Sequence, residues 1–340
     1  MAPLDRRTFT RSLLAVPAAA LAGAGLGALA PAAASAAPAD WDAHYVAGAS
    51  LELFHRSRRG DDGTWSPSWD KIDTADAAPY RVSCVGMYNG LNVVAGLNSG
   101  GPSHGIRGAD GTWTAFTRIP STSGPTTGIP SVAVTARSRE LHVFGASEGG
   151  TTLYRTVRNQ DGTWSPSWTA LRTFSSIRQV ATTRVGTTID TAVLTEDDVL
   201  RHSIQAPDGT WSGWGNIGSA AGEIGGFYRV ALAGLGSQLH VFALSQNGGV
   251  VHHAVRNGDG SWRQFSKLSV FANHHPFAIC AANIGGEIHV GILEITASNT
   301  QVVRFSIRRT DGTWRSVGTV SSSGISQPGQ LAVSGTERII

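Results

Sequence analysis

The sequence predicts an all-β fold, a six-bladed β-propeller in which each blade contains four antiparallel strands. Three observations support this fold class: one short string recurs six times, its copies are evenly spaced, and the two ends of the chain supply complementary parts of one repeat. The composition agrees, because 42 glycines, 10 tryptophans and only 15% charged residues are typical of strands and tight turns rather than of a helical array.

The recurring string is Asp-Gly-Thr-Trp, with serine in place of threonine in one copy. Its tryptophans are Trp65, Trp113, Trp164, Trp211, Trp262 and Trp314. They lie 48, 51, 47, 51 and 52 residues apart, a period typical of propellers and arrays. Each Asp-Gly pair predicts a two-residue hairpin in which both central residues have positive φ. The tryptophan beyond it is expected to lock the hairpin by packing against the next sheet.

The strand pattern is clearest in the third copy, where strand-like runs are expected at 131–136, 141–146, 152–157 and 163–169. The first copy lacks a strand before 44–49, whereas residues 330–334 repeat that missing strand and then stop. We therefore expect the terminal strands to pair within one blade, which removes the exposed edges of an open array. The propeller is predicted to span residues 40–340.

Residues 1–39 resemble a twin-arginine signal peptide. Arg6 and Arg7 precede an alanine- and leucine-rich run, and Ala-x-Ala cleavage choices follow at 34–36 and 37–39. Because alanine and glycine dominate the run, it is a poor transmembrane helix, so cleavage, secretion and no stable membrane insertion are expected. The segment carries three arginines and one aspartate, a contribution of +2 to the formal +3, and no basic run remains to bind nucleic acid.

The two cysteines, Cys84 and Cys280, are too few for a disulfide framework and lack the spacing of a zinc site. They occupy matching first-strand positions in blades 2 and 6. Sheets packed about 10 Å apart place them beyond the reach of a disulfide, so both are expected to be free and buried. The sequence indicates no metal and no cofactor.

Several segments resemble the repeats of bacterial propeller lectins related to the fucose-binding and Photorhabdus-type lectins. They are Leu153-Tyr154-Arg155, the run from Asp161 to Trp168, and Leu239-His240-Val241-Phe242, and the likeness spans the chain after the signal. The turn also resembles the Asp-box of sialidase-like propellers. The resemblance implies a sugar site repeated with the blades but no particular monosaccharide, because the regular arginine, glutamate and tryptophan set of fucose-binding repeats does not recur here.

Aromatic residues that follow the repeat tryptophan are candidate sugar platforms, because a sugar ring offers an apolar face to an aromatic ring. We predict Trp69, Trp168 and Trp214 as platforms, with Arg58, Arg158 and Arg256 as polar partners. The alternative is that the rings fill space between blades, and that the arginines only bridge hairpin aspartates. A further third-strand position is expected to face the core between blades, where its histidines would bond backbone groups. Its residues are His55, His104, Arg155, His202, His253 and Phe305.

An enzymatic alternative centres on the channel mouth. Tyr80-Arg81 and Tyr228-Arg229 begin the first strands of opposing blades, so they are expected to face each other across the axis. A sialidase-like reaction also needs carboxyl groups, and none recurs near these strands, while Glu196-Asp197-Asp198 is expected to be a solvated turn. The sequence therefore favours a secreted lectin-like propeller that binds carbohydrate, with a glycoside hydrolase or a protein-binding scaffold as alternatives and the oligomeric state left open.

Overall fold

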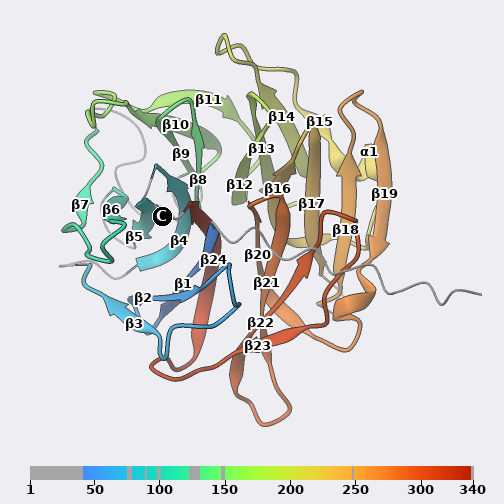
Figure 1. Ribbon diagram of the computed structural model, residues 1–340. Coiled ribbons are helices and arrows are strands. Elements are labelled where there is room, and N and C mark those ends of the chain that lie inside the picture. Colours follow the sequence, from blue (N-terminus) through green and yellow to red (C-terminus); the bar gives the residue numbers. More distant parts are fainter. Residues whose placement is uncertain are drawn as a thin grey trace, which may run out of the picture. The chain divides into compact units, whose positions relative to one another are not determined.

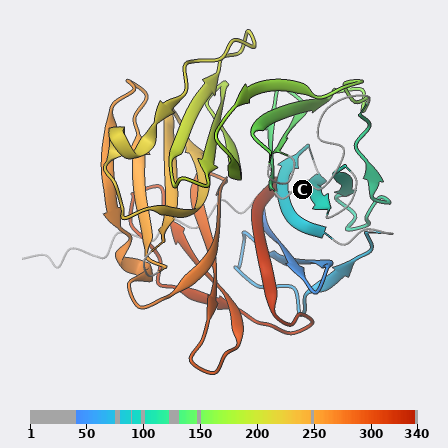
Figure 2. The same cartoon turned by 180° about the vertical axis from the view of Figure 1, so that it is seen from behind.

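The computed structural model describes residues 41–74, 79–88, 90–97, 101–121, 131–146, 150–246 and 249–337. The predicted signal peptide at 1–39 lies outside these residues. Within them the chain forms six four-stranded antiparallel sheets, each in meander order from the axis outward. Figure 1 and Figure 2 show these sheets as the blades of a propeller, which confirms the predicted fold class.

The first three blades contain the following strands. Blade 1 contains β24 (Pro328–Glu337), β1 (Trp41–Ala49), β2 (Glu52–Arg58) and β3 (Asp70–Ile72). Blade 2 contains β4 (Pro79–Met87), β5 (Gly90–Leu97), β6 (Ser103–Arg107) and β7 (Thr117–Arg118). Blade 3 contains β8 (Ser131–Arg137), β9 (Glu140–Ala146), β10 (Thr152–Arg158) and β11 (Thr169–Thr173).

The other three blades follow the same order. Blade 4 contains β12 (Ile177–Val185), β13 (Thr188–Thr195), β14 (Leu200–Gln205) and β15 (Gly215–Asn216). Blade 5 contains β16 (Phe227–Leu235), β17 (Gln238–Ser245), β18 (Val251–Arg256) and β19 (Trp262–Lys267). Blade 6 contains β20 (Pro276–Ile284), β21 (Glu287–Ile295), β22 (Gln301–Arg308) and β23 (Gly318–Val320). A short helix α1 (Ile217–Ala221) and a 3-10 turn (Ser269–Phe271) join blades 4 to 5 and 5 to 6.

The ring is closed by the terminal strands, as predicted. Strand β24 pairs with β1 in an antiparallel ladder that runs from Trp41 opposite Glu337 to Ala49 opposite Pro328. The last strand of the chain therefore supplies the innermost strand of blade 1, and no edge is left at the junction between the chain's beginning and its end.

Short polar side chains link the innermost strands of neighbouring blades. Ser334, Ser83 and Ser131 accept hydrogen bonds from the backbone amides of Gly86, Val134 and Val180, at 2.8, 3.1 and 2.6 Å. Gln179 bonds both the amide and the carbonyl of Val230, at 3.0 and 2.8 Å, and Asn283 donates to Gly234 O at 2.8 Å. Side-chain hydrogen bonds therefore connect neighbouring blades, whereas backbone hydrogen bonds connect the strands within each blade.

The core is divided into six apolar clusters, one at each boundary between blades. Cys84 and Cys280 lie in the clusters at the two boundaries of blade 1 and are free and buried, as predicted. Burial raises the pKa of both thiols. Among the described residues no helix is long and apolar enough to cross a membrane.

The turn at each repeat differs from the predicted two-residue hairpin. In blade 3, Gly162 N donates to Asn159 O at 3.0 Å and Asn159 N to Thr163 O at 2.7 Å, so the loop has three residues. Gly162 has a φ of +88°, whereas Asp161 does not have positive φ. Its carboxylate instead accepts hydrogen bonds from the amide and hydroxyl of Thr163, at 2.9 and 2.7 Å, and this local bonding decides the turn.

The fourth strand of the third copy begins later than predicted. Strand β11 starts at Thr169, and Trp164 forms only an isolated bridge to Arg158. Between Thr169 opposite Arg155 and Trp164 opposite Arg158, the four residues 165–168 face the two residues 156–157, so the outer strand bulges. The predicted start at residue 163 gave too little weight to Pro166 and the serines on either side of it, which disfavour a regular strand.

Candidate functional site

Two of the predicted aromatic platforms lie in the core. Trp69 and Trp168 are 3% and 4% exposed, within the apolar clusters at the 6–1 and 2–3 boundaries. A platform needs an open ring face, so the structure favours the space-filling alternative for both rings. Trp214 is half-buried and stacks on Trp211, with ring centroids 6.3 Å apart. Part of the Trp214 ring is therefore exposed to solvent at the 3–4 boundary.

The repeat tryptophans, which were assigned a structural role alone, are all half-buried at blade boundaries. Each ring packs against a residue of the preceding blade, and five of those partners lie at the third-strand position predicted to face the core. The five pairs, with their ring-centroid distances, are Phe305–Trp65 (5.2 Å), His55–Trp113 (5.7 Å), His104–Trp164 (5.4 Å), His202–Trp262 (6.0 Å) and His253–Trp314 (6.3 Å). The predicted location of these residues between blades is confirmed. The expected backbone partners are wrong, because the four histidines bond side chains of the neighbouring second strand.

The predicted arginines lie over the glycine of their own hairpin. A Cβ atom on Gly162 would be 2.9 Å from Nη2 of Arg158, and one on Gly260 would be 3.3 Å from Nη2 of Arg256. Arg58 covers Gly63 in the same way, and all three arginines are half-buried. The glycine is therefore required both for its positive φ and for the space that the guanidinium occupies. Each of these arginines also pairs in the strand register with the repeat tryptophan of its own blade.

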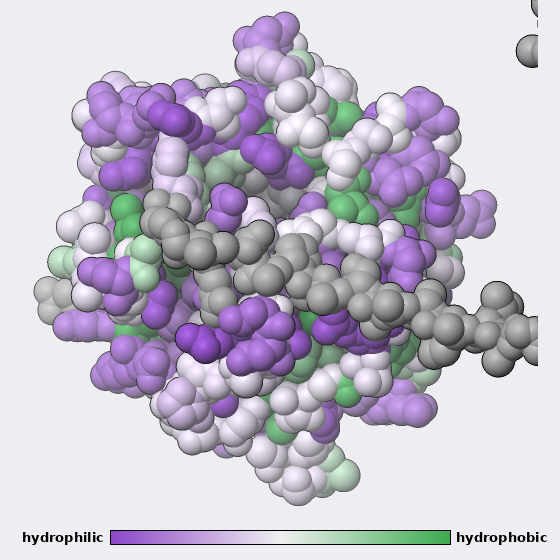
Figure 3. Space-filling view, in the orientation of Figure 1, coloured by the Kyte–Doolittle hydropathy of each residue, from purple (hydrophilic) through white to green (hydrophobic). Residues whose placement is uncertain are grey.

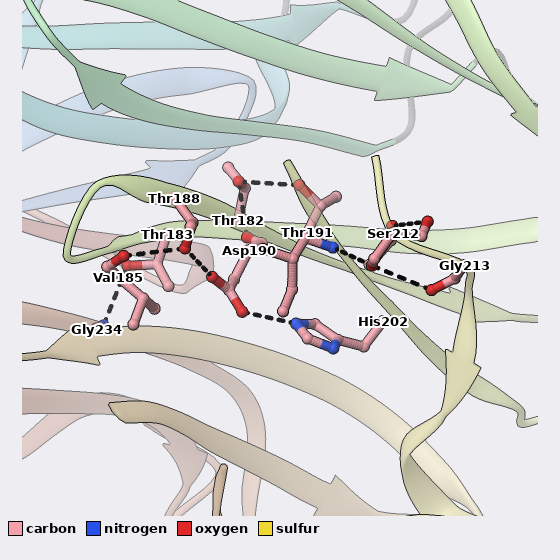
Figure 4. Close-up of polar contacts among 12 residues, drawn as sticks. Thr182, Thr183, Val185, Thr188, Asp190, Thr191, His202, Ser212, Gly213 and Gly234 are labelled. Carbon is pink, nitrogen blue, oxygen red and sulfur yellow. Dashed lines mark hydrogen bonds and ion pairs between the residues drawn. The ribbon is translucent and has the colours of Figure 1, made fainter. Parts of the chain in front are cut away.

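A polar residue recurs at one position on the second strand of each blade and was not predicted from the sequence. This position follows a buried aliphatic or alanine residue in every blade and is occupied by His44, Asn92, His142, Asp190, His240 and His289. In blade 4, Asp190 Oδ1 bonds His202 Nε2 at 2.8 Å, and its Oδ2 accepts from Thr188 at 3.0 Å (Figure 4). In blades 1 and 5 the partners are both histidines, at 2.9 Å. Alignment of the six copies beyond the tryptophan would have revealed this polar layer.

Burial disfavours the charged form of six histidines, four in this layer and two on the third strands. Desolvation, followed by the charge of nearby arginines or histidines, lowers the pKa of His44, His142, His240 and His289 to about 3 and that of His104 and His253 to about 4. A neutral imidazole both donates and accepts a hydrogen bond, which allows histidine pairs such as His44 and His55 to bond each other.

The boundary between blades 6 and 1 combines a carboxylate, two guanidiniums and an indole. Glu287 is 1% exposed and lies 3.5 Å from Nη2 of Arg315. Arg58 interacts electrostatically with Glu287 and Arg315, and its guanidinium lies 5.9 Å from the Phe305 ring. Trp65 packs on Phe305 in the same cluster. Two blades thus bring an arginine, a glutamate and a tryptophan together at this boundary, although these residue types do not recur regularly along the repeats.

Polar atoms at this boundary are left without partners. Tyr45 Oη, Glu287 Oε2, His289 Nδ1 and Arg315 Nε are buried and have no hydrogen-bond partner among the described residues. Buried polar atoms are nearly always bonded, because an unmade bond costs about 1–3 kcal/mol. The cluster therefore holds unused donors and acceptors beside the half-buried Arg58 and Trp65.

The axial channel has a narrow mouth where the first strands begin. Arg81 and Arg229, from blades 2 and 5, line one cavity of about 60 Å³ together with Arg178, so the structure brings the two predicted arginines together. The Tyr228 ring lies under its neighbour Arg229, with 4.2 Å between the guanidinium carbon and the ring centre, and the side chain of Tyr80 lies outside the described residues.

The acidic hairpin is not simply solvated, as the sequence analysis expected. Arg178 donates from Nε to Glu196 at 2.9 Å and from Nη1 to Asp198 at 2.7 Å. Arg178 occupies the first-strand position that Tyr228 has in blade 5, and from there it reaches the hairpin of its own blade. No carboxylate belongs to the described lining of the narrow mouth, whereas glycoside hydrolysis uses two.

The described residues contain no group of three or more histidine, cysteine, aspartate or glutamate side chains placed to hold a metal ion. The face of the molecule seen in Figure 3 is predominantly hydrophilic, and its apolar residues lie in small separate areas.

The fold is similar to that of fucose-binding propeller lectins. The lectin of Aleuria aurantia in complex with Fucalpha1-6GlcNAc aligns with a TM-score of 0.57 at 18% identity, covering 85% of this chain and 94% of that chain. The SapL1 lectin in complex with alpha methyl fucoside aligns with a TM-score of 0.50 at 15% identity, covering 73% and 82%. A chain of a nidogen/laminin complex aligns with a TM-score of 0.51 at 10% identity, covering 86% and 98%. No protein-family model and no curated protein matches the sequence.

Proposed function

We propose that the protein is a lectin-like propeller that binds carbohydrate at boundaries between its blades. The observation that carries this proposal is the polar cluster at the 6–1 boundary, where Arg58 and Trp65 flank buried donors and acceptors that lack partners. Sugar hydroxyls both donate and accept, so they match the half-buried guanidinium of Arg58, which borders the buried carboxylate, imidazole and phenol groups of the cluster. The indole edge adds an apolar surface for the sugar ring.

The 1–2 boundary has a related combination. Arg107 of blade 2 lies near Asp42 and Asp70 of blade 1, and Trp113 is half-buried beside it. These two boundaries pair arginine and carboxylate across blades, so we place binding there first. Fucosides are the first ligands to test, because solved lectins of this fold are complexes with fucosides.

A titration of methyl α-fucoside, preceded by a glycan array, tests this function. We expect saturable binding that quenches tryptophan fluorescence, and loss of that binding in Arg58→Ala and Glu287→Gln. Arg118→Ala, which removes an exposed arginine from β7, is the matched control and should bind normally. A thermal melt of each variant separates lost binding from lost folding. An array on which no glycan shows saturable binding would reject the proposal.

Export is the second part of the proposal. The twin-arginine pair and the cleavage choices in residues 1–39 support secretion of the folded propeller. We expect the amino terminus of the exported protein to begin near residue 37 or 40, as mass spectrometry would measure. Replacement of Arg6 and Arg7 by lysine should keep the protein inside the cell with its signal attached, and unchanged export would contradict this assignment.

A further inference from the structure

We propose that the wide mouth of the axial channel binds an anionic saccharide, at a site separate from the blade boundaries. This mouth lies where the first strands end, opposite the narrow mouth, and opens into a cavity of about 650 Å³. All six blades contribute to its lining. The volume falls in the range of about 300–1,000 Å³ typical of small-molecule sites, which suits a saccharide of a few rings.

The charged groups of this mouth are all of one sign. Arg137, Arg139 and Arg184 line the cavity, and no aspartate or glutamate belongs to its described lining. Within the part of the chain that the structure describes, none of the three arginines forms an ion pair with a carboxylate. Glu140 pairs with Arg137 in the strand register, but its carboxylate lies 3.3 Å from His142. The cavity therefore concentrates positive charge, which attracts an anion.

Strained hairpins hold two of the side chains on the rim. Ser138 and Arg139 form the two-residue turn between β8 and β9, and both have positive φ, of 50° and 73°. Tyr88 has a φ of 54° in the equivalent turn of blade 2. Blade 6 has Gly285 and Gly286 at this turn, which adopt such φ without strain. Non-glycine residues in this conformation cost about 1–3 kcal/mol and cluster at ligand-binding sites.

The two turns place an aromatic ring, Tyr88, and a cation, Arg139, side by side at the solvent-exposed rim. Tyr88 is 49% exposed, and the Arg139 guanidinium carbon lies 5.6 Å from the centre of its ring across the boundary between blades 2 and 3. An exposed tyrosine beside an arginine offers a flat surface to a sugar ring and a forked donor to its acidic group. Trp41 adds a second aromatic ring, a half-buried indole, to the lining.

Several other polar groups of the lining are already bonded within the protein, which narrows the chemistry of the ligand. Thr183 accepts from Gly234 N at 3.2 Å, and the amide of Asn283 bonds Gly234 and Gly286 at 2.8 and 2.9 Å. Ser334 accepts from Gly86. Arg137 donates from Nη1 to the carbonyl oxygen of Ala206 at 3.0 Å. Arg139 and Arg184 are thus the main charged donors that face the cavity, and they match a ligand with a carboxylate, sulfate or phosphate group.

Titration calorimetry with trigalacturonate as the probe, and with its fully methyl-esterified form as the neutral control, tests this site. The first variant combines Arg139→Asn with Arg184→Gln, since asparagine tolerates positive φ. Its matched control combines Arg118→Gln with Arg172→Gln, which removes the same charge from exposed outer strands. Tyr88→Asn removes the ring without adding strain to the turn. A sulfated disaccharide and mannose 6-phosphate are tested in parallel to identify the acidic group.

We expect the acid to bind and the ester not to bind. Binding should fall about tenfold or more in the Arg139/Arg184 variant and in Tyr88→Asn, and by less than about twofold in the Arg118/Arg172 control. Arg58→Ala, which alters the proposed fucoside site, should leave binding of the acidic probe unchanged, so the two proposals can fail separately. Equal loss in the Arg118/Arg172 control, equal binding of the ester, or no binding of any of the three acidic probes would overturn the inference.

Discussion

His55 of blade 1 meets the repeat tryptophan of blade 2, Trp113, edge to face, with ring centroids 5.7 Å apart and an interplanar angle of 76°. The imidazole is 3% exposed, whereas the indole is half-buried. The same contact recurs at other boundaries, so one residue of the repeated string locks its own hairpin and also joins its blade to the preceding one.

We therefore expect Trp113→Ala to weaken the whole ring. Truncation of a packed indole removes its apolar contacts and leaves a cavity, with an expected loss of about 3 kcal/mol in the free energy of unfolding. Urea denaturation followed by circular dichroism measures this change. Trp113→Phe, which keeps an aromatic edge contact with His55, should lose less than half as much. A Trp113→Ala protein as stable as the parent would show that the contact does not join the blades.

Acid should destabilise the protein below neutral pH. The folded pKa of His44 and His289 lies at about 3 and that of His104 at about 4, below the unfolded value of about 6.5. Between these values the unfolded chain binds protons that the folded chain excludes, so stability is complete above about pH 6.5 and is lost as the pH falls. At pH 5 each independently titrating histidine costs about 2 kcal/mol. The melting temperature measured from pH 7.5 to pH 5 reports the loss.

His104→Gln provides a control for this acid sensitivity. His104 Nε2 bonds Asn92 Oδ1 at 2.9 Å, and the glutamine amide can donate to the same oxygen without titrating. The variant should show a smaller fall in melting temperature between pH 7.5 and pH 5. An identical fall in the two proteins would mean that other groups control acid unfolding.

The glycine of the repeated turn should be intolerant of a side chain. Gly162→Ala forces alanine to a φ of +88° and places its Cβ against the Arg158 guanidinium, so we expect a loss of at least about 1 kcal/mol in the free energy of unfolding. Arg158→Ala removes the contact but not the backbone strain. The double variant, measured by chemical denaturation, should therefore lose less free energy of unfolding than the two single variants lose together. Strictly additive losses would exclude the contact.

Deletion of residues 328–340 should abolish folding. These residues include all of β24, which supplies the innermost strand of blade 1 and pairs with β1 along its length. Its loss exposes an edge and opens the clusters on both sides of the blade. Removal of residues 338–340 leaves β24 intact and should have little effect. A cooperative melt of the protein that lacks residues 328–340, measured by differential scanning calorimetry, would contradict the closed ring.

The sequence predicted the architecture well because the repeat is encoded locally. Asp161-Gly162-Thr163-Trp164 and its copies set the period, and residues 330–334 revealed the shared blade. The turn type was wrong because Thr163 hydrogen bonds hold Asp161 in a conformation that the dipeptide preference does not anticipate. The outer-strand bulge was missed because strand propensity does not report register.

The candidate binding residues were harder to predict than the fold, because the exposure of a side chain depends on packing between blades. Trp168 and Trp214 follow the repeat tryptophan in similar contexts, yet the first is 4% exposed and the second is half-buried. The cluster around Glu287 joins strands from opposite ends of the chain, so no local pattern marks it. The role of Arg178 depends on a hairpin eighteen residues later, and only the folded sheet shows that it bonds Glu196.

The register of the terminal ladder has a mechanical consequence. Trp41 lies opposite Glu337, so the two ends of the propeller leave blade 1 at the same end of one strand pair. A pulling force applied between them loads the hydrogen bonds of that ladder one after another, as in a zipper, rather than all together in shear. The ring should consequently yield first at this seam under low tension, while the other five blades remain intact until the seam has opened.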